Sequence, residues 1–205
     1  MRVLIVTPYI SSPIHPAFWT KAKQTGLGYI INDIAAYVGK KEEVDLFAYV
    51  IMSPSISADG FNIIGHSYWS IIKNFKLKSI ISAYYFLKKY PNPTFKGKLK
   101  TYGKSMVLSQ LYNILDNYDV VHIHGISEAT NFAVEICKQQ KVKYLVTLHG
   151  LISFEDSVDA SPGVKQYERD FLVQAASEGI PVTFVSSGIK ETAENFIKNY
   201  TRNQQ

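Results

Sequence analysis

Two short stretches of sequence decide the fold: Asp119-Val-Val-His-Ile-His-Gly125 and Leu145-Val-Thr-Leu-His-Gly150. Each is an apolar run with the length of a buried strand, each ends in His-Gly, and a helix-length segment separates them. Two strands joined through a helix run parallel, and small molecules bind outside the carboxyl ends of parallel strands. The pattern therefore predicts a ligand-binding rim that carries imidazoles and flexible glycines.

The remaining sequence alternates apolar strands and amphipathic helices around these two stretches. Strands are expected at 2–7, 44–49, 61–64, 120–123, 144–148 and 182–185, and helices at 27–38, 68–89, 104–117, 127–140, 164–177 and 188–200. Loops are expected at 8–28, 52–60, 91–103 and 150–163. This order predicts the α/β class, with a doubly wound, Rossmann-like parallel sheet covered by helices on both faces.

Composition sets the class of protein. The chain has 205 residues, 46% of them hydrophobic, which is enough for a proper core. Its single cysteine, Cys137, cannot form a disulfide within the chain, and this usage suits a reducing compartment. The amino-terminal apolar run is too short for a signal peptide, and no run reaches the roughly 18 apolar residues of a membrane span. We expect a cytoplasmic protein, with peripheral contact to the inner face of a membrane.

Charge is distributed unevenly along the chain. Residues 60–115 contain nine lysines and no acidic residue, whereas the remainder has 13 basic and 17 acidic residues. Tyrosine, tryptophan and phenylalanine interleave with these lysines, a composition that suits an anionic membrane surface. A solvated helix face with its aromatic side chains in the core is the alternative, and nucleic acid is not expected because no recognition module accompanies the patch. The expected membrane-contact residues are Trp69, Lys73, Lys76, Lys78, Lys88 and Lys89.

The glycine pair Gly26 and Gly28 opens the first helix. Free backbone N–H groups at a helix amino terminus favour a phosphate or another anion, so both glycines are candidate substrate-binding residues. A nicotinamide dinucleotide fingerprint requires its glycines directly after the first strand. Here they follow a long loop and the third glycine position holds Ile31, which disfavours a nicotinamide-dependent enzyme.

The histidines can be interpreted as metal ligands or as hydrogen-bonding groups. His122 and His124 share one face of their strand, but no cysteine or carboxylate at a matching strand end completes a metal site, so none is expected. His122 is expected to pack within the sheet with a satisfied hydrogen bond. His124 and His149 are expected at the rim, where neutral imidazoles bind a hydroxyl-rich ligand.

Polar groups in two further segments are weaker candidates. Ser186 and Ser187 follow a strand end without the glycine that precedes a nucleophilic serine, and fit a helix N-cap better. Glu155, Asp156 and Asp159 follow His149 and could act as acid or base, although loop carboxylates are usually solvated.

Several motifs occur in a characteristic order along residues 1–200. They are Thr25-Gly-Leu-Gly28 after a long first loop, Glu43-Val-Asp-Leu-Phe47, Asp119-Val-Val-His-Ile-His-Gly125, Val146-Thr-Leu-His-Gly150 and Pro181-Val-Thr-Phe-Val-Ser-Ser-Gly-Ile-Lys-Glu191. In order and spacing they resemble the amino-terminal domain of a family 4 glycosyltransferase. The resemblance implies a GT-B fold, in which two Rossmann-like domains face each other across a cleft. Residues 1–200 would form the single acceptor-binding domain, and 201–205 would begin the linker to a carboxy-terminal donor-binding domain.

By this resemblance, the loop with Gly26 and Gly28 would face the donor phosphates and His149 would contact the transferred sugar as the catalytic residue. His124, Gly125, Gly150 and Ser187 would line the cleft as substrate-binding residues. The implied partners are a nucleotide-sugar donor, which is a substrate rather than a cofactor, and a glycan or lipid-linked acceptor in surface polysaccharide or glycolipid synthesis.

The family's carboxy-terminal domain supplies an arginine and a lysine that hold the nucleotide diphosphate, and two glutamates seven residues apart. These motifs do not occur in this sequence. The domain alone is therefore expected to bind acceptor weakly and to transfer nothing. A stand-alone carbohydrate- or anion-binding module and, less well supported, a nicotinamide-dependent Rossmann enzyme are the alternatives.

Overall fold

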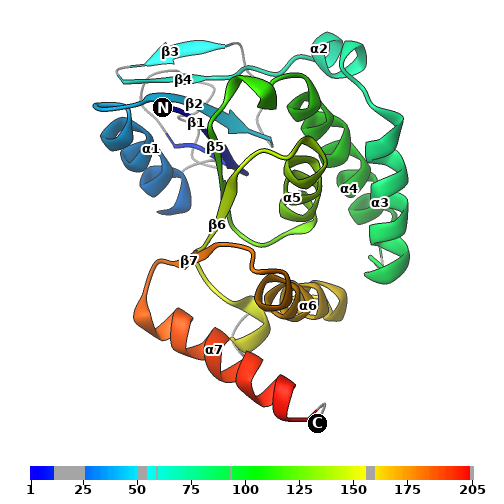
Figure 1. Ribbon diagram of the computed structural model, residues 1–205. Helices are drawn as coiled ribbons and strands as arrows, with labels where there is room; N and C mark the ends of the chain where they lie inside the picture. Colours follow the sequence, from blue (N-terminus) through cyan, green and yellow to red (C-terminus); the bar gives the residue numbers. More distant parts are fainter. Residues whose placement is uncertain (12–25, 50–54, 59, 93, 156–159, 204–205) are drawn as a thin grey trace.

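The computed structural model describes residues 1–11, 26–49, 55–58, 60–92, 94–155 and 160–203 (Figure 1). A seven-stranded sheet with the order β3-β4-β2-β1-β5-β6-β7 forms its centre. All neighbouring strands are parallel except β3 and β4, which pair antiparallel. The strands are β1 (Arg2–Thr7), β2 (Glu43–Ala48), β3 (Ile56–Ala58), β4 (Phe61–Ile63), β5 (Val120–His124), β6 (Tyr144–Leu148) and β7 (Val182–Phe184).

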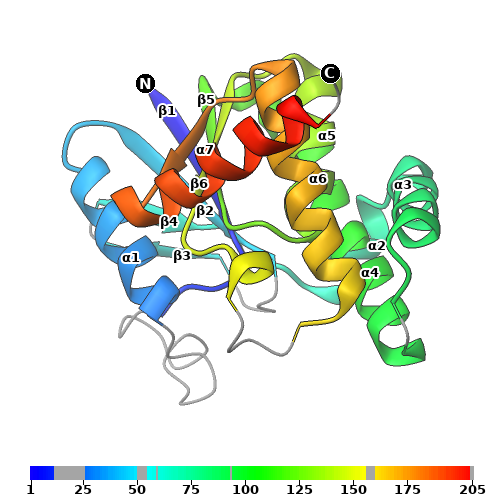
Figure 2. The same cartoon turned by 90° about the horizontal axis from the view of Figure 1, so that it is seen from below.

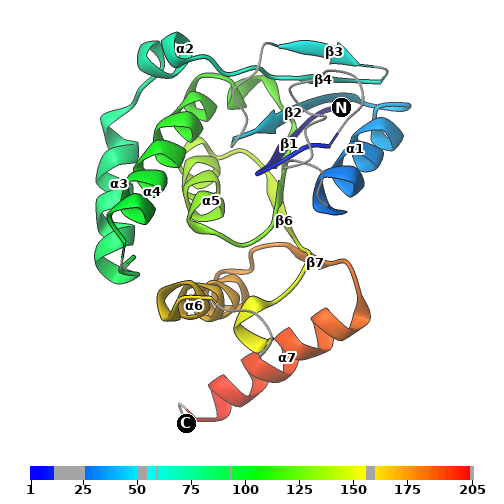
Figure 3. The same ribbon diagram turned by 180° about the vertical axis from the view of Figure 1, so that it is seen from behind.

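Helices connect these strands and cover the sheet unevenly. The α-helices are α1 (Gly26–Val38), α2 (Tyr68–Lys73), α3 (Leu77–Lys89), α4 (Phe95–Leu108), α5 (Glu128–Gln140), α6 (Pro162–Glu178) and α7 (Ser187–Arg202). Short 3-10 turns occur at η2 (Ser109–Asn113), η3 (Leu115–Asn117) and η4 (Ile152–Phe154). Figures 1 and 3 show α1 on one side of the sheet and α3, α4 and α5 on the other, with α6 and α7 beyond β7.

Two apolar cores result because successive side chains of a strand point to opposite faces of the sheet. On β1, Val3 and Ile5 belong to the core that contains Ile31 and Ala35 of α1. Leu4 and Val6 belong to the larger core, which α3, α4, α5 and α6 share. The predicted doubly wound, Rossmann-like sheet with helices on both faces is therefore confirmed.

The structure differs from the sequence-based expectation in the lysine-rich segment. The helix expected at 68–89 is two helices, because Asn74 caps α2 and the chain turns before α3 begins. The loop expected at 91–103 is wrong over most of its length, since α4 already begins at Phe95. Thr94 explains this start: its side chain accepts a hydrogen bond from the backbone N–H of Gly97 at 3.0 Å. One face of α4, which includes Thr101, is buried. The free energy gained by this burial exceeds the cost of the two glycines within the helix.

Two further differences are small. Strand β3 lies where a loop was expected at 52–60, and it is an edge strand of only three residues. The helix expected at 104–117 ends as an α-helix at Leu108 and continues as the 3-10 turns η2 and η3. Most of the loop expected at 8–28, and part of each of the other expected loops, lies outside the described residues.

Candidate functional site

Three histidines meet at the carboxyl ends of β5 and β6. The rings of His122 and His124 have centroids 4.0 Å apart, which confirms that they share one face of their strand. His124 Nδ1 lies 2.9 Å from His149 Nε2, so one of these rings donates a hydrogen bond to the other. His124 is only 1% exposed. It therefore reaches the rim through His149 rather than by direct contact with solvent, which differs from its expected position.

Hydrogen bonds across the sheet hold the first histidine of the cluster in place. His122 Nε2 lies 2.6 Å from the Thr147 hydroxyl, which in turn lies 2.6 Å from the Thr183 hydroxyl. This row of polar side chains crosses β5, β6 and β7 on one face of the sheet. The expectation that His122 is packed within the sheet and hydrogen-bonded is confirmed.

The histidine cluster is uncharged at neutral pH. Burial lowers the pKa of His122 to about 4 and the pKa of His124 to about 2, because a charged ring would lose its hydration. Burial also lowers the pKa of His149, which is half-buried. Neutral imidazoles carry one donor and one acceptor nitrogen each. The cluster is therefore suited to hydrogen-bonding hydroxyl groups rather than to holding an anion by charge.

The hydrogen bond between His124 and His149 determines what the outer ring offers to a ligand. Within the described part of the chain, no group bonds Nδ1 of His149. If His149 Nε2 accepts the proton of His124, then Nδ1 of His149 carries a hydrogen and donates. If His149 Nε2 donates, then its Nδ1 accepts. A hydroxyl group satisfies both forms, since it is donor and acceptor at once.

Glycine is required directly after β5. Gly125 has φ +88°, a backbone conformation that other residues rarely adopt, and its N–H donates to Thr147 O at 2.9 Å. Thr130 in the first turn of α5 donates from its hydroxyl to Gly125 O at 2.6 Å. The chain is thus turned sharply between His124 and α5. Gly150 follows His149, and a Cβ added there would lie 3.6 Å from a carboxylate oxygen of Glu155.

A buried carboxylate that sequence reasoning missed anchors the segment after Gly150. Glu168 of α6 is 3% exposed and accepts from the N–H of Ile152 at 3.1 Å and the N–H of Ser153 at 2.5 Å. It also accepts from the hydroxyl of Ser153. These bonds fix η4, which connects the His149 turn to the body of the domain. Its spacing of four and seven residues from the apolar Leu172 and Ala175, on one helix face, was the only signal in the sequence.

The amino terminus of α1 lies against Ser11, in the segment that follows β1. A Cβ added to Gly28 would lie 2.3 Å from Oγ of Ser11, so Gly28 is needed for close packing. A Cβ added to Gly26 would meet no atom within 4 Å among the described neighbours. Figure 2 shows the starts of α1 and α6 and the turn η4 along one side of the molecule. Thr25 and the long loop before it lie outside the described residues.

The last strand brings its serines to the same edge. Val185 N–H donates to Leu148 O at 3.2 Å, which sets the start of α7 beside the end of β6. Ser186 is the N-cap of α7, since its side chain accepts from the N–H of Ile189 at 3.3 Å, and Ser187 is the first helical residue. The N-cap interpretation of these serines is confirmed. Of the loop carboxylates, Glu155 is exposed, and Asp156 and Asp159 lie outside the described residues.

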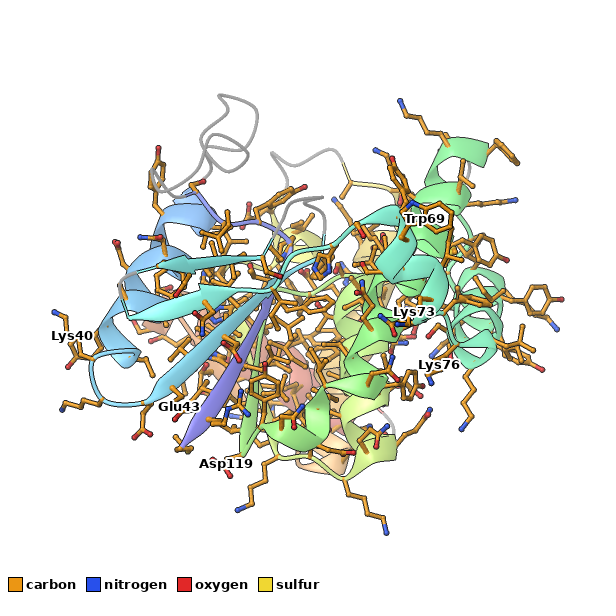
Figure 4. The ribbon with its side chains drawn as sticks, turned by 90° about the horizontal axis from the view of Figure 1, so that it is seen from above. Lys40, Glu43, Trp69, Lys73, Lys76 and Asp119 are labelled. Atoms are coloured by element: carbon orange, nitrogen blue, oxygen red, sulfur yellow. The ribbon has the colours of Figure 1, made fainter. Side chains whose placement is uncertain are left out.

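The lysine-rich segment forms one flank of the molecule. Figure 4 shows Trp69, Lys73 and Lys76 on this flank and Lys40 on the opposite one. Trp69 is 81% exposed, and all six expected membrane-contact residues are exposed. Lys89 differs from the others because its Nζ lies 3.1 Å from a carboxylate oxygen of Asp170. Some aromatic residues fit a membrane-contact surface and others fit a solvated helix face with its aromatic side chains in the core. Exposed are Tyr68, Trp69, Tyr84, Tyr85 and Phe95, whereas Phe86, Tyr90 and Tyr102 pack against the core.

Neither a metal-ligand cluster nor a membrane-spanning helix occurs among the described residues. No group of three or more histidine, cysteine, aspartate or glutamate side chains in that part of the chain is arranged to hold a metal ion. None of the helices described combines the length and apolar character that crossing a membrane requires.

Comparisons with known proteins show the fold. No family model and no curated protein sequence matches the chain. Two solved structures are similar: an alpha,alpha-trehalose-phosphate synthase (UDP-forming) from Burkholderia vietnamiensis, with a TM-score of 0.51 and 11% identity, and an alpha,alpha-trehalose 6-phosphate synthase from Burkholderia multivorans, with a TM-score of 0.50 and 14% identity. Each similarity covers 98% of this chain and 43% of the other, so the chain spans less than half the length of either structure. The chain therefore has the Rossmann-like fold of one GT-B domain.

Proposed function

We propose that this chain is the acceptor-binding domain of a retaining glycosyltransferase, which transfers a sugar from a nucleotide-sugar donor to a glycan or lipid-linked acceptor. One observation carries the proposal. The hydrogen-bonded pair of neutral imidazoles, His124 and His149, lies at the carboxyl edge of a GT-B domain, beside a glycine turn that needs positive φ. The motif order that resembles family 4 glycosyltransferases agrees with it.

In this proposal His149 hydrogen-bonds a hydroxyl group of the transferred sugar, and His124 is a positioning residue that holds the ring of His149. Gly125, Gly150 and Ser187 shape the cleft wall, and Gly26 presents backbone N–H groups toward the donor phosphates. Catalysis depends on orienting two substrates and on stabilising the leaving diphosphate. The diphosphate is held by a second domain, so the 205 residues alone should not transfer sugar.

The test uses the protein encoded by the complete reading frame, with its own membrane fraction as the acceptor source. Release of nucleoside diphosphate and incorporation of labelled sugar are measured for a panel of nucleotide sugars. His149→Ala should lower kcat at least tenfold, with the fold intact by circular dichroism at the assay temperature. Tyr37→Ala, an exposed aromatic residue in the last turn of α1, is the matched control. Equal kinetics of wild type and His149→Ala would contradict the assignment of His149.

We also propose that the lysine-rich flank holds the domain on an anionic membrane surface on the cytoplasmic side. The support is the exposure of Trp69 beside lysines that no acidic residue of the same segment neutralises. Each lysine near an anionic surface contributes about 1 kcal/mol, so removing two should weaken binding roughly thirtyfold. Flotation with phosphatidylserine vesicles at low salt measures this.

The flotation variants can be matched closely. Lys73→Gln with Lys76→Gln should lose binding. Lys40, on the opposite flank, and its chain neighbour Lys41 give the control, since Lys40→Gln with Lys41→Gln should keep it. If wild-type protein does not float, or if both double variants bind equally, the membrane proposal is wrong.

A further inference from the structure

A second site lies over the carboxyl ends of β1 and β2, away from the histidine cluster. It is a pocket of about 500 Å³ whose walls are mostly apolar. Tyr9 and Tyr49 follow the two strands, Ile71 comes from α2, and Gly103 and Val107 come from α4. Because ligands of parallel sheets bind at this edge, the pocket is well placed to hold part of a substrate.

Two lysines make one part of the pocket wall basic. Lys100 and Lys104 of α4 line it, and the segment that contains them has no acidic residue. Lys104 is partly neutralised, since its Nζ lies 2.7 Å from a carboxylate oxygen of Glu128. Lys100 is exposed at the surface and forms no ion pair with any of the described residues. An apolar pocket with lysines at its wall fits a ligand that is both apolar and acidic.

A buried hydrogen-bond donor in the wall has no partner. Gln110 Nε2 donates to Val107 O at 3.3 Å, which orients the amide, and the same NH₂ group lies 3.2 Å from Nδ1 of His66. Nδ1 of His66 therefore accepts, and Nε2 carries the proton. His66 is 3% exposed, and Nε2 finds no partner among the described residues. Buried donors are rarely left unpaired, so a ligand oxygen atom that reached this N–H from the pocket would complete its hydrogen bonding.

The pocket lies between the turn after β5 on one side and the lysine-rich flank on the other. The hydroxyl of Tyr49 lies 3.4 Å from the hydroxyl of Ser127, the N-cap of α5, and Ser127 follows Gly125 by two residues. Tyr68, the first residue of α2, lines the pocket and is followed by the exposed Trp69. A ligand held here could therefore reach from the exposed aromatic surface toward the turn that carries Gly125.

We infer that this pocket binds the apolar part of an amphipathic acceptor that carries a phosphate group, with Lys100 and Lys104 beside the phosphate and His66 donating to an acceptor oxygen. The inference rests on the proposed transferase function and narrows its acceptor to the lipid-linked class. It differs from the contact of the flank with a membrane, because a single acceptor molecule enters the pocket.

The pocket can be filled without damaging the fold. Gly103 lines it, lies within α4, and has no atom within 4 Å of the position that a Cβ would take. Gly103→Leu therefore places an apolar side chain in open space and also replaces a helix-weakening glycine. Ala176→Leu adds a similar side chain at an exposed position of α6 and is the matched control. Lys100→Met keeps the aliphatic stem and removes the charge.

The experiment is calorimetric titration of the 205-residue chain with decyl phosphate below its micelle concentration, with inorganic phosphate and decyl maltoside as comparison probes. Decyl phosphate should bind at least tenfold more tightly than either. Gly103→Leu should weaken the binding of decyl phosphate at least tenfold, with an equal or higher melting temperature. Ala176→Leu should leave this binding unchanged, and Lys100→Met should weaken it severalfold.

The proposal is overturned if Gly103→Leu binds decyl phosphate as tightly as wild type, or if decyl maltoside binds equally well. Failure of this proposal is separate from failure of the transferase proposal. The titration contains no sugar donor, whereas the His149 assay measures diphosphate release with native membrane acceptor. If the complete protein transfers sugar but the chain does not bind decyl phosphate, the pocket proposal is wrong and the transferase proposal is kept. If the chain binds decyl phosphate but the complete protein transfers no sugar, only the transferase proposal is wrong.

Discussion

Glu168→Gln is the sharpest test of how the His149 turn is held. The carboxylate of Glu168 is buried and accepts three hydrogen bonds from Ile152 and Ser153. Glutamine keeps the shape but removes the charge, and its NH₂ group would face an N–H donor. A hydrogen bond to a charged group contributes about 1.5–3 kcal/mol against about 1 for a neutral pair, and a buried donor left unpaired costs about 1–3 kcal/mol. The expected loss is about 3 kcal/mol of unfolding free energy.

A loss of this size should lower the melting temperature by roughly 6–12 °C for a domain of this length. Circular dichroism at 222 nm follows the melt, and hydrogen exchange of the Ile152 and Ser153 amides reports the turn itself. Glu178→Gln, on the same helix, removes a surface ion pair with Lys138 and should change stability by less than about 1 kcal/mol. If Glu168→Gln melts within 1 °C of wild type and both amides remain protected, the carboxylate does not anchor η4.

Three further outcomes follow from the same structure. Burial lowers the pKa of His66 to about 4, so between about pH 6.5 and 4 the unfolded chain binds a proton that the folded chain does not. Denaturant titrations should therefore show that the unfolding free energy falls by about 1–2 kcal/mol for this residue as the pH drops from 7 to 5. The slope should be shallower in His66→Gln. Gly28→Ala should lower the melting temperature because its Cβ would meet Ser11, whereas Gly26→Ala should not; equal effects would contradict the packing role of Gly28. Gly125→Ala should cost about 1–2 kcal/mol from its positive φ alone, since the added Cβ meets no atom within 4 Å, and an unchanged midpoint in guanidinium would show that the turn adapts.

The sheet could be predicted from the sequence because its signal is local. Buried parallel strands are continuous apolar runs, and β1 and β6 were expected at their observed ends. The part of α4 before Lys104 could not be predicted, because proline and glycine within residues 91–103 indicate a loop and only the cap at Thr94 and burial against α3 and α5 reverse that. Strand β3 carries too few residues for any periodicity to be visible.

Part of the candidate site could also be predicted, because that part depends on local sequence patterns. Period-two alternation is enough to put His122 and His124 on one face, and the two His-Gly endings indicate one edge. The contact between His124 and His149 depends on the register of β5 and β6, which a single sequence does not specify. Glu168 is sixteen residues away from Ile152, and the pocket around Gly103 joins four separate segments, so neither leaves a local pattern.

The row of polar side chains from His122 through Thr147 to Thr183 has a consequence for how the sheet assembles. The strand β7 has only three residues, so few backbone hydrogen bonds determine its alignment with β6. A slip of one residue along either strand would turn a threonine hydroxyl into the apolar core on the opposite face and leave an imidazole nitrogen without a partner. The polar row thus penalises misaligned intermediates during folding, and it secures the correct pairing of the strands that later carry the site.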